Sequence, residues 1–340
     1  MSSVDLRVGG VVYSGWTDVH VTKSLEQLAH SFKVQVTDRW ADDTKAGAPL
    51  EPVPIQAGST VRVDSDSERL ITGYVVSDQS SYDATSRRIN IAGVSKTGDL
   101  VDCTAQYRSG AWRNESLLTI AKNLCDPFDI DVSANVDLGD RLRRFSIEEG
   151  ESVFTCLSRA ARRRSALLLS DSDGNLVFDR AAETRIRTVL DYGVNILSGS
   201  RSDSWARRYS DYTVKVQTSG TDESHGKATT LKRSVSDTTI DRHRPIVILG
   251  DNESNGTELS KRVTWERNTR SGRDRRYNYT VQGWRHANGF WEPNTLVRVA
   301  DARFRIDETL LIVSCTFSKN SSGTTTILEL SAPEAFSLES

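Results

Sequence analysis

The stretch STVRVDSDSERLITGYVV (residues 59–76) consists of a short apolar-alternating segment, a polar spacer and a longer β-rich run. A second stretch, TLVRVADARFRIDETLLIVSCTF (residues 295–317), has the same three parts and the same VRV tripeptide. Alternation at a period of two is typical of half-buried strands. Because the two stretches lie more than two hundred residues apart, they indicate a duplicated β unit.

Further segments recur around these stretches in the same order. The pairs are VHVTKSL (19–25) with NILSGSRS (195–202), SFKVQV (31–36) with DYTVKV (211–216), and the hairpin-like residues 73–93 with residues 314–332. We therefore predict two copies over about 19–93 and 196–332, in which Val34 corresponds to Val214 and Val61 to Val297. The alternative is chance similarity, because alternating Val and Ile are common in β-rich sequences.

Between the two copies the pattern changes to helices and short strands. Residues 114–127 (NESLLTIAKNLCDP) and 149–169 each carry apolar residues at the spacing of one helical face. Residues 166–179 (ALLLSDSDGNLVFD) predict a hairpin that turns on Asp173–Asn175. The sequence therefore predicts a two-layer α/β unit in the middle of the chain.

These patterns predict a mainly β protein with an α+β insert. We expect two similar small β-barrel or roll domains, at residues 1–104 and 191–340, to flank a two-layer α/β domain at residues 105–190. The second β domain is expected to be a pseudo-repeat of the first.

Composition excludes several classes of protein. The 340 residues include 44 basic and 46 acidic side chains, so the net charge of −2 favours neither nucleic acid nor an anionic membrane surface. The longest apolar runs fall far short of the roughly 20 residues that a membrane span needs, and the N-terminus lacks the features of a signal peptide. The four cysteines show no CxxC spacing, which favours free thiols in a reducing compartment.

No catalytic or metal-binding constellation stands out. SKTG (95–98) and the SxxK at 224–227 occur in the reverse of the order used by penicillin-recognising enzymes. Glu148, Glu149 and Glu151 open a predicted helix, where negative charge favours the N-terminus without any catalytic role. The five histidines are scattered. We therefore expect no enzymatic activity, no cofactor and no metal site.

Residues 261–286 (KRVTWERNTRSGRDRRYNYTVQGWRH) combine arginines with aromatic residues. Such a combination can stack bases and hold phosphates. RRYNYTV also alternates as a strand does, so the aromatics would face a core while the arginines face a loop or a partner's carboxylates. We interpret the segment as a solvated or interface-facing hairpin and keep nucleic-acid binding as an alternative.

Four stretches of the chain resemble those of a known family. They are AGVSKTGDLVDCTA (92–105), SVFTCLSRAARRRSALLLSDSDGNLVF (152–178), SGSRSDSWARRYSDYTVKV (198–216) and GFWEPNTLVRVAD (289–301). Together with two β units around an α/β insert and the lack of catalytic residues, they resemble the baseplate hub proteins of contractile-tailed phages. The likeness is closest to the Mu-like, gpP-type tail proteins, and the type VI secretion spike shares the hub architecture in its N-terminal part.

The resemblance implies a structural protein of the virion tail baseplate, assembled in the bacterial host cytoplasm. Three chains with two β units each would form a ring of six positions that adapts a threefold spike to a sixfold tail tube. Its partners would be two further copies, the spike, and the tube or other baseplate proteins, with DNA passing through the lumen without specific binding. A tail-associated cell-wall hydrolase is the second alternative.

The strand pattern also suggests which residues would face the lumen or an interface, and the alternative is that these polar faces point to bulk solvent. FKVQV and YTVKV place Lys33 and Gln35, and Thr213 and Lys215, on the face opposite the core. The arginines of the basic segment are the other candidates. The predicted interface or lumen residues are Lys33, Gln35, Lys215, Arg270, Arg273, Arg275 and Arg276.

Overall fold

The computed structural model describes residues 4–39, 55–83, 86–164, 166–217, 230–250 and 256–337. Strands dominate these residues, so the mainly β class expected from the sequence is confirmed. Within the described ranges, no helix is long and apolar enough to cross a membrane.

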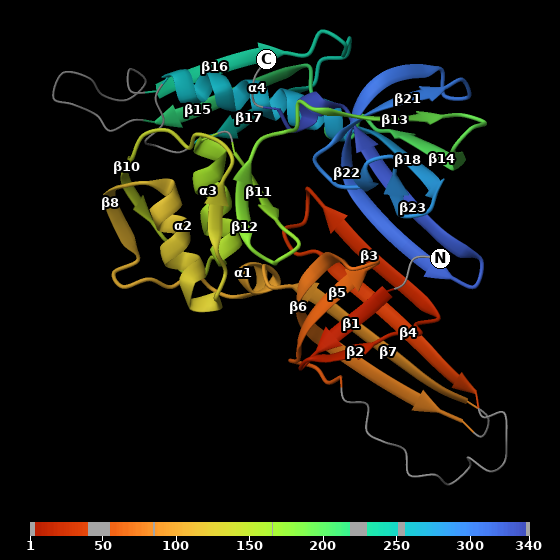
Figure 1. The fold of residues 1–340 in the computed structure, drawn as a ribbon. Helices are drawn as coiled ribbons and strands as arrows, with labels where there is room; N and C mark the ends of the chain where they lie inside the picture. The colour runs from red at the N-terminus through yellow and green to blue at the C-terminus, as the bar shows by residue number, and fades with distance from the viewer. Residues whose placement is uncertain are drawn as a thin grey trace.

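One sheet of thirteen strands runs through both halves of the chain, from the red and orange strands to the blue ones in Figure 1. Its N-terminal half comprises β1 (Val4–Val8), β2 (Val11–Tyr13), β3 (Asp18–Ser24), β4 (Ser31–Arg39), β5 (Thr60–Ser65), β6 (Glu68–Tyr82) and β7 (Ser86–Ser95). Its C-terminal half comprises β13 (Arg185–Asp191), β14 (Ile196–Asp203), β18 (Arg275–Gln282), β21 (Leu296–Asp301), β22 (Ile306–Asn320) and β23 (Gly323–Ser331).

The two halves are joined by a direct strand pairing. β3 pairs antiparallel with β22, from Ser24 opposite Ser314 to Val19 opposite Lys319. One hydrophobic cluster extends across this join and includes residues of both halves. The two β units are therefore joined edge to edge into one continuous sheet, with a shared core.

The order of strands in the two halves is the same over five strands. In the first half the order is β3-β4-β7-β6-β5, and in the second it is β14-β18-β23-β22-β21. The longest strands, β6 and β22, have 15 residues each. Each is bulged at the same place, at Val76 against β7 and at Val313 against β23. The outer strands differ, because β1 is antiparallel to β5 whereas β13 is parallel to β21.

The predicted equivalence of Val34 with Val214 is wrong. DYTVKV forms β15 (Asp211–Gln217), which belongs to a separate sheet with β16 (Thr230–Ser236) and β17 (Pro245–Leu249). Its apolar face packs against Leu259 and Val263 of α4 (Gly256–Arg273), in a cluster of its own. Alternation marks any half-buried strand, whatever core it faces, so the pattern alone could not identify the sheet.

The counterpart of β4 is instead β18, which lies after this inserted sheet and helix. Counting along the pairings from the two bulges places Tyr279 where Val34 stands in the first half. The same count places Val297 at the position of Val61. The segment 261–286 is therefore no hairpin: it is the end of α4 followed by β18 and β19 (Arg285–His286).

The middle of the chain packs as a layer of helices over short strands, beside the main sheet (Figure 1). Leu117 and Phe154 both belong to its own hydrophobic cluster. Ser116 and Ser152 cap the two longer helices, since each hydroxyl accepts a hydrogen bond from a backbone N–H three residues on. The elements are α1 (Gly98–Asp102), β8 (Ala111–Glu115), α2 (Leu117–Cys125), η2 (Asp126–Phe128), β9 (Val132–Ala134), β10 (Leu142–Ser146), α3 (Val153–Arg163), β11 (Leu167–Ser170) and β12 (Leu176–Asp179). The short elements β20 (Gly289–Phe290) and η4 (Pro333–Ala335) belong to the C-terminal half.

A buried ammonium group links three parts of the chain. Lys23 Nζ on β3 donates to both carboxylate oxygens of Glu292, at 2.9 and 3.1 Å, and to the hydroxyl of Ser172 at 3.2 Å. Glu292 belongs to the loop between β20 (Gly289–Phe290) and β21, and Ser172 to the turn between β11 and β12. The side chain of Lys23 is almost fully buried, so this ion pair is needed to compensate its charge.

A buried histidine lies at the same junction. His30 Nε2 donates to the backbone carbonyl of Ser170 at 3.0 Å, which requires the proton to be on Nε2. Burial, aided by the nearby positive charge of Lys23, lowers the pKa of His30 from 6.5 to about 3. The imidazole is therefore neutral in the folded protein at any physiological pH.

We predict that Glu292→Gln destabilises the fold by about 3 kcal/mol, because it leaves the Lys23 ammonium buried without a countercharge. Urea unfolding measures the change. Asp307→Asn is the control: it breaks an exposed pair with Arg298 and should cost less than about 0.5 kcal/mol. Equal losses in the two variants would contradict the structural role of Lys23.

Stability should also depend on the charge of His30. The unfolded chain binds a proton at this residue below pH 6.5 and the folded chain does not, so the stabilisation is complete above pH 6.5 and is lost as the pH falls toward 3. Between pH 7 and pH 5 the wild type should lose about 2 kcal/mol more than His30→Gln. Parallel pH dependences in the two proteins would show that His30 is not the group responsible.

Candidate assembly surface

One face of the main sheet is polar where the two halves meet. On β4, Lys33 is exposed and Gln35 is half-buried, while Phe32 and Val34 point to the core. Lys33 lies opposite His20 of β3, so the two side chains share this face. Lys33 and Gln35 therefore lie on a polar face of the sheet, and their assignment to an interface or lumen stays a prediction.

The same face continues across the join into the second half. His20 Nδ1 lies 3.1 Å from the hydroxyl of Ser318, and the hydroxyls of Thr22 and Thr316 lie 3.3 Å apart. On β18 the positions equivalent to Lys33 and Gln35 are Asn278 and Thr280. Short polar side chains therefore line this face in both halves.

Lys215 does not belong to this surface. It lies on β15, opposite Lys232 of β16 and Leu249 of β17, on the side of the small sheet away from α4. Leu249 and its neighbour Val247 are both exposed there. The sequence pattern paired Lys215 with Lys33 only because it assigned β15 to the wrong sheet.

The four predicted arginines are held by acidic partners within the chain. Arg270 pairs with Glu266 one turn earlier on α4, and Arg275 pairs with Glu308 of β22 at 2.7 Å. Arg273 and Arg276 both pair with Glu26, at 3.0 and 2.6 Å. Arg273, Arg275 and Arg276 therefore connect α4 and β18 to other parts of the fold, whereas the Arg270 pair lies within α4.

Three of the four Tyr and Trp side chains in the basic segment (Tyr277, Tyr279 and Trp284) are in the core, and the fourth, Trp265, is half-buried on α4 with the Arg262 guanidinium 4.9 Å from its ring centre. Tyr277 and Tyr279 of β18 are buried, with their rings stacked 6.4 Å apart. The Tyr279 hydroxyl donates to Asp301 at 3.0 Å, and burial together with this carboxylate raises the pKa of Tyr279. Buried rings are unable to stack on bases, which disfavours the nucleic-acid alternative.

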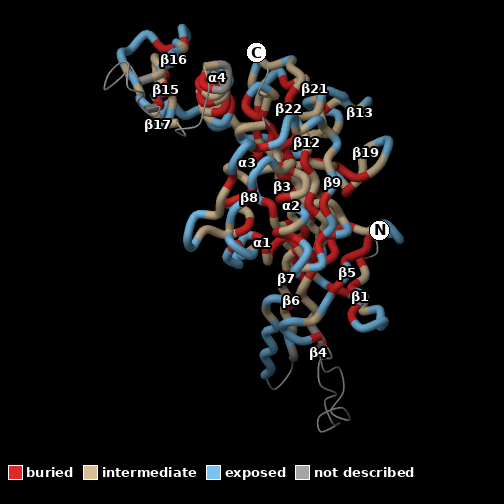
Figure 2. Tube along the Cα trace, turned by 90° about the vertical axis from the view of Figure 1, so that its left-hand side faces the viewer, coloured by how far each residue is buried: buried red, intermediate tan, exposed pale blue. Residues whose placement is uncertain are grey.

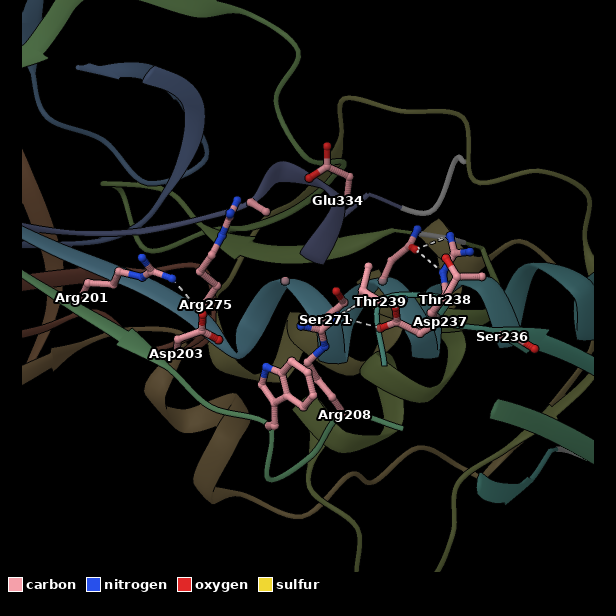
Figure 3. A pocket seen from close by; sticks show the side chains of 15 residues that line it. Arg201, Asp203, Arg208, Ser236, Asp237, Thr238, Thr239, Ser271, Arg275 and Glu334 are labelled. Atoms are coloured by element: carbon pink, nitrogen blue, oxygen red, sulfur yellow. Dashed lines mark hydrogen bonds and ion pairs between the residues drawn. The ribbon is translucent and has the colours of Figure 1, made fainter. Parts of the chain in front are cut away.

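A pocket of about 630 Å³ lies beside the outer strand β14 (Figure 3). Arg201 and Asp203 at the end of β14 form an ion pair at 2.9 Å, and Trp205 follows them in the lining. The remaining lining includes Arg208, Asp237, Thr239, Arg267, Asn268, Ser271, Arg275 and Glu334.

The charges in this pocket are matched internally. Arg208 pairs with Asp237 at 2.8 Å, and both side chains are nearly buried. Burial opposes ionisation of Asp237, but hydrogen bonds from Thr239 and Arg208 outweigh it and hold its pKa below the usual value. The described lining contains no histidine or cysteine, and two of its three acids, Asp203 and Asp237, are engaged by arginines. The Arg208–Asp237 pair therefore holds the two segments that carry it together, and the pocket is not arranged for proton transfer.

The other chemical motifs of the sequence also have structural roles. Arg159 contacts Glu151 at 2.7 Å and Glu148 at 3.4 Å across the start of α3. Ser95 and Thr97 of SKTG are buried and hydrogen-bonded to each other at 2.7 Å. The SxxK at 224–227 lies outside the described residues. Among the residues described, no group of three His, Cys, Asp or Glu side chains is placed to hold a metal ion.

Sequence reasoning missed the two open strand edges on this surface. β14 is the last strand of the main sheet, and nearly all its residues are exposed. The second half of β6 is equally exposed; Figure 2 shows this end of the molecule in pale blue, at the bottom of the view. No local pattern in the sequence marked these edges, because an open edge depends on which strands pair.

Comparison with protein families gives four matches along the chain. They are the Mu phage baseplate assembly protein GpP-like N-terminal domain (residues 3–95), the baseplate hub protein gp44-like second domain (97–180), the tail protein NMB1110-like third domain (208–263) and the Mu phage baseplate assembly protein GpP fourth domain (256–339). The models thus follow one another along most of the sequence.

Individual relatives agree with these matches. The baseplate hub protein gp44 of Escherichia phage Mu is 31% identical over 324 residues, which cover 92% of this chain and 83% of that protein. The 43 kDa tail protein of prophage MuSo2 from Shewanella oneidensis superposes with a TM-score of 0.88 at 36% identity, over 99% of this chain and all of that one. A tail protein from Neisseria meningitidis shares the fold, with a TM-score of 0.83 at 22% identity, over 98% of this chain and 99% of that one.

Arg276→Met should affect stability rather than nucleic-acid binding. Its side chain is largely buried against Glu26 and Glu329, so the loss should be about 2–4 kcal/mol in urea unfolding. Lys261→Met, at an exposed position of the same basic segment, should change stability by less than about 0.5 kcal/mol. Retention on a DNA column at 150 mM salt should be equally low for all three proteins. A drop in retention specific to Arg276→Met would restore the nucleic-acid alternative.

Proposed function

Because this chain belongs to the Mu-type baseplate hub family and is a structural hub protein of a Mu-like phage or prophage tail, we propose that three copies of it close into a ring. Each copy contributes two β units, so the ring presents six similar positions. Such a ring adapts a threefold spike on one side to a sixfold tail tube on the other.

The observation that carries this proposal is the shared strand order of the two halves. Strands β3-β4-β7-β6-β5 and β14-β18-β23-β22-β21 follow the same path, with bulges at Val76 and Val313. A threefold assembly can offer six equal contacts only if each chain repeats the contact-forming unit. The repeat supports this arrangement in a way that a single β domain would not.

The polar face of the sheet supports a wet central channel. We assign Lys33 and Gln35, together with Asn278 and Thr280, to the lining of this channel. A polar lining suits the passage of DNA without specific binding, whereas an apolar one would form a large exposed patch before assembly. Arg273, Arg275 and Arg276 contribute indirectly, by fixing α4 and β18 behind this face, and Arg270 contributes an ion pair within α4.

The remaining parts of the chain then have peripheral roles. We propose the division into residues 1–104, 105–190 and 191–340, with the middle unit and the α4 sheet outside the ring and in contact with other baseplate proteins. The protein is a component of the virion tail, and we place its assembly in the bacterial host cytoplasm. The ion pair of Arg159 with Glu151 and the burial of Ser95 support a role without catalysis.

The ring predicts a particle mass three times the chain mass of 37.7 kDa. Light scattering coupled to size exclusion, over 1–50 μM protein, measures the mass directly. We expect one species of three chains, and two or six chains would contradict the proposed symmetry. A single-chain mass at 50 μM would refute a ring that forms from this protein alone.

A further inference from the structure

We infer that the second half of β6 pairs with β14 of the next copy, in an antiparallel ladder that places Ser81 opposite Ser200. This inference rests on the proposed ring and names the residues that close it. The strand pairing between β3 and β22 within one chain serves as its template. We call the pairing of residues Ser77–Tyr82 of one copy with residues 199–204 of its neighbour the seam.

The template lies on β22, which uses one edge for two partners in succession. Its first part pairs with β21, up to Leu311 opposite Leu296. Beyond the bulge at Val313, the same edge pairs with β3, from Ser314 to Lys319. A long strand thus spans the boundary between two β units.

β6 repeats only the first of these two pairings. It pairs with β5 up to Tyr74 opposite Thr60, as β22 does with β21. Beyond its bulge at Val76, the part from Ser77 to Tyr82 pairs with β7 alone among the described strands. An unpaired row of backbone donors and acceptors on a long strand is a template for pairing with another chain.

β14 is the matching unpaired strand. β3 pairs with β4 on one side and with β22 on the other. β14 pairs with β18, and apart from an isolated bridge between Ile196 and Tyr192 it has no second strand partner within the described residues. The open edges of β6 and β14 are therefore the two that the repeat leaves unused in one chain. Their counterparts, β22 and β3, pair with each other within one chain, so β6 and β14 are expected to pair in the same way between two copies.

The register follows from the strand pairings within one chain. Aligning the bulges places Ser81 where Ser318 stands on β22. The pairings through β7 and β4, and through β23 and β18, place Ser200 where His20 stands on β3. Since His20 lies opposite Ser318 in the template, Ser200 lies opposite Ser81 in the seam.

Side chains at one end of the seam are apolar and uncovered. In the template, the N–H of Leu25 donates to the carbonyl of Val313, whose side chain is fully buried in a cluster that includes Leu25. The equivalent residues are Trp205 and Val76, which are 45% and 57% exposed. In the seam the side chains of Trp205 and Val76 cover each other. Because Trp205 lines the pocket beside β14, the pocket lies next to this contact.

Polar residues continue the seam along the channel face. His20 and Thr22 contact Ser318 and Thr316 in the template. The corresponding pairs in the seam are Ser200 with Ser81 and Ser202 with Gln79, which are equally able to hydrogen-bond. The polar face therefore continues unbroken from one copy to the next.

One pair of like charges also meets in this register. Asp78 lies opposite Asp203, and like charges directly opposite destabilise a sheet. Arg201, which holds Asp203 at 2.9 Å, lies diagonal to Asp78 and supplies the compensating charge. In the seam, Arg201 would thus lie close to two carboxylates, that of Asp203 in its own chain and that of Asp78 in the neighbouring copy.

Cysteine pairs test the register. In a Cys103→Ser background, which removes the one exposed thiol among four, Ser81→Cys combined with Ser200→Cys should give a covalent trimer on a non-reducing gel after mild oxidation. Reduction should return it to single chains, and each single variant should stay uncrosslinked. The matched control combines Tyr82→Cys with Ser200→Cys, because a slip of one residue turns the two sulfurs to opposite faces.

The outcomes separate the seam from the ring. A trimeric mass without crosslinking, or equal crosslinking in the control pair, would overturn the seam and leave the proposed ring standing. A single-chain mass would overturn both. A ladder that continues beyond three chains would show that the seam forms an open filament instead of a closed ring.

The apolar contact has its own matched test. Val76→Asp should weaken association by about 100-fold or more per seam, because a buried valine is exchanged for a desolvated carboxylate. Val247→Asp is the control, at an equally exposed valine of the small sheet (56% against 57%). The mass of the first variant should fall to one chain at concentrations where the second remains trimeric. Equal masses for the two would contradict a contact at Val76.

Discussion

The pairing of β3 with β22 determines most of this architecture. It joins two units of the same strand order into one sheet, and it fixes how one unit follows the next. Because strands pair through the backbone, this join requires no special side chains, and short polar residues can occupy its exposed face. A scaffold that repeats one backbone contact thus leaves the side chains of its exposed face available for other contacts.

The join is reinforced by a small set of buried polar groups. Lys23 of β3 donates hydrogen bonds to Glu292 of the second half and to Ser172 of the middle unit, and His30 donates one to the carbonyl of Ser170. Gly174 brings the same turn close to β6: its φ of +81° and a carbonyl 2.8 Å from where a Cβ would stand both exclude other residues. The three parts of the chain are therefore fixed to one another at one place, which keeps the geometry of the repeat.

Much of this could be predicted from the sequence, and the errors have physical causes. The VRV tripeptides marked strands that occupy the same position, at Val61 and Val297, because both sit on buried hairpins of equal construction. DYTVKV was misassigned because alternation shows that one face of a strand is buried but does not show which element covers that face. The covering element is α4. The basic segment showed its arginines but not their carboxylates, since Glu26 and Glu308 are distant in sequence. The open edges of β6 and β14 depend on which strands pair, and no local pattern encodes that.

The central claim is that the two halves of one chain occupy equivalent positions about a common axis. End-on electron-microscope images of the purified assembly test it most directly. We predict averages with six similar lobes around a central channel, from particles that contain three chains, with successive lobes related by a rotation of about 60°. Three lobes, or six lobes from six chains, would contradict it.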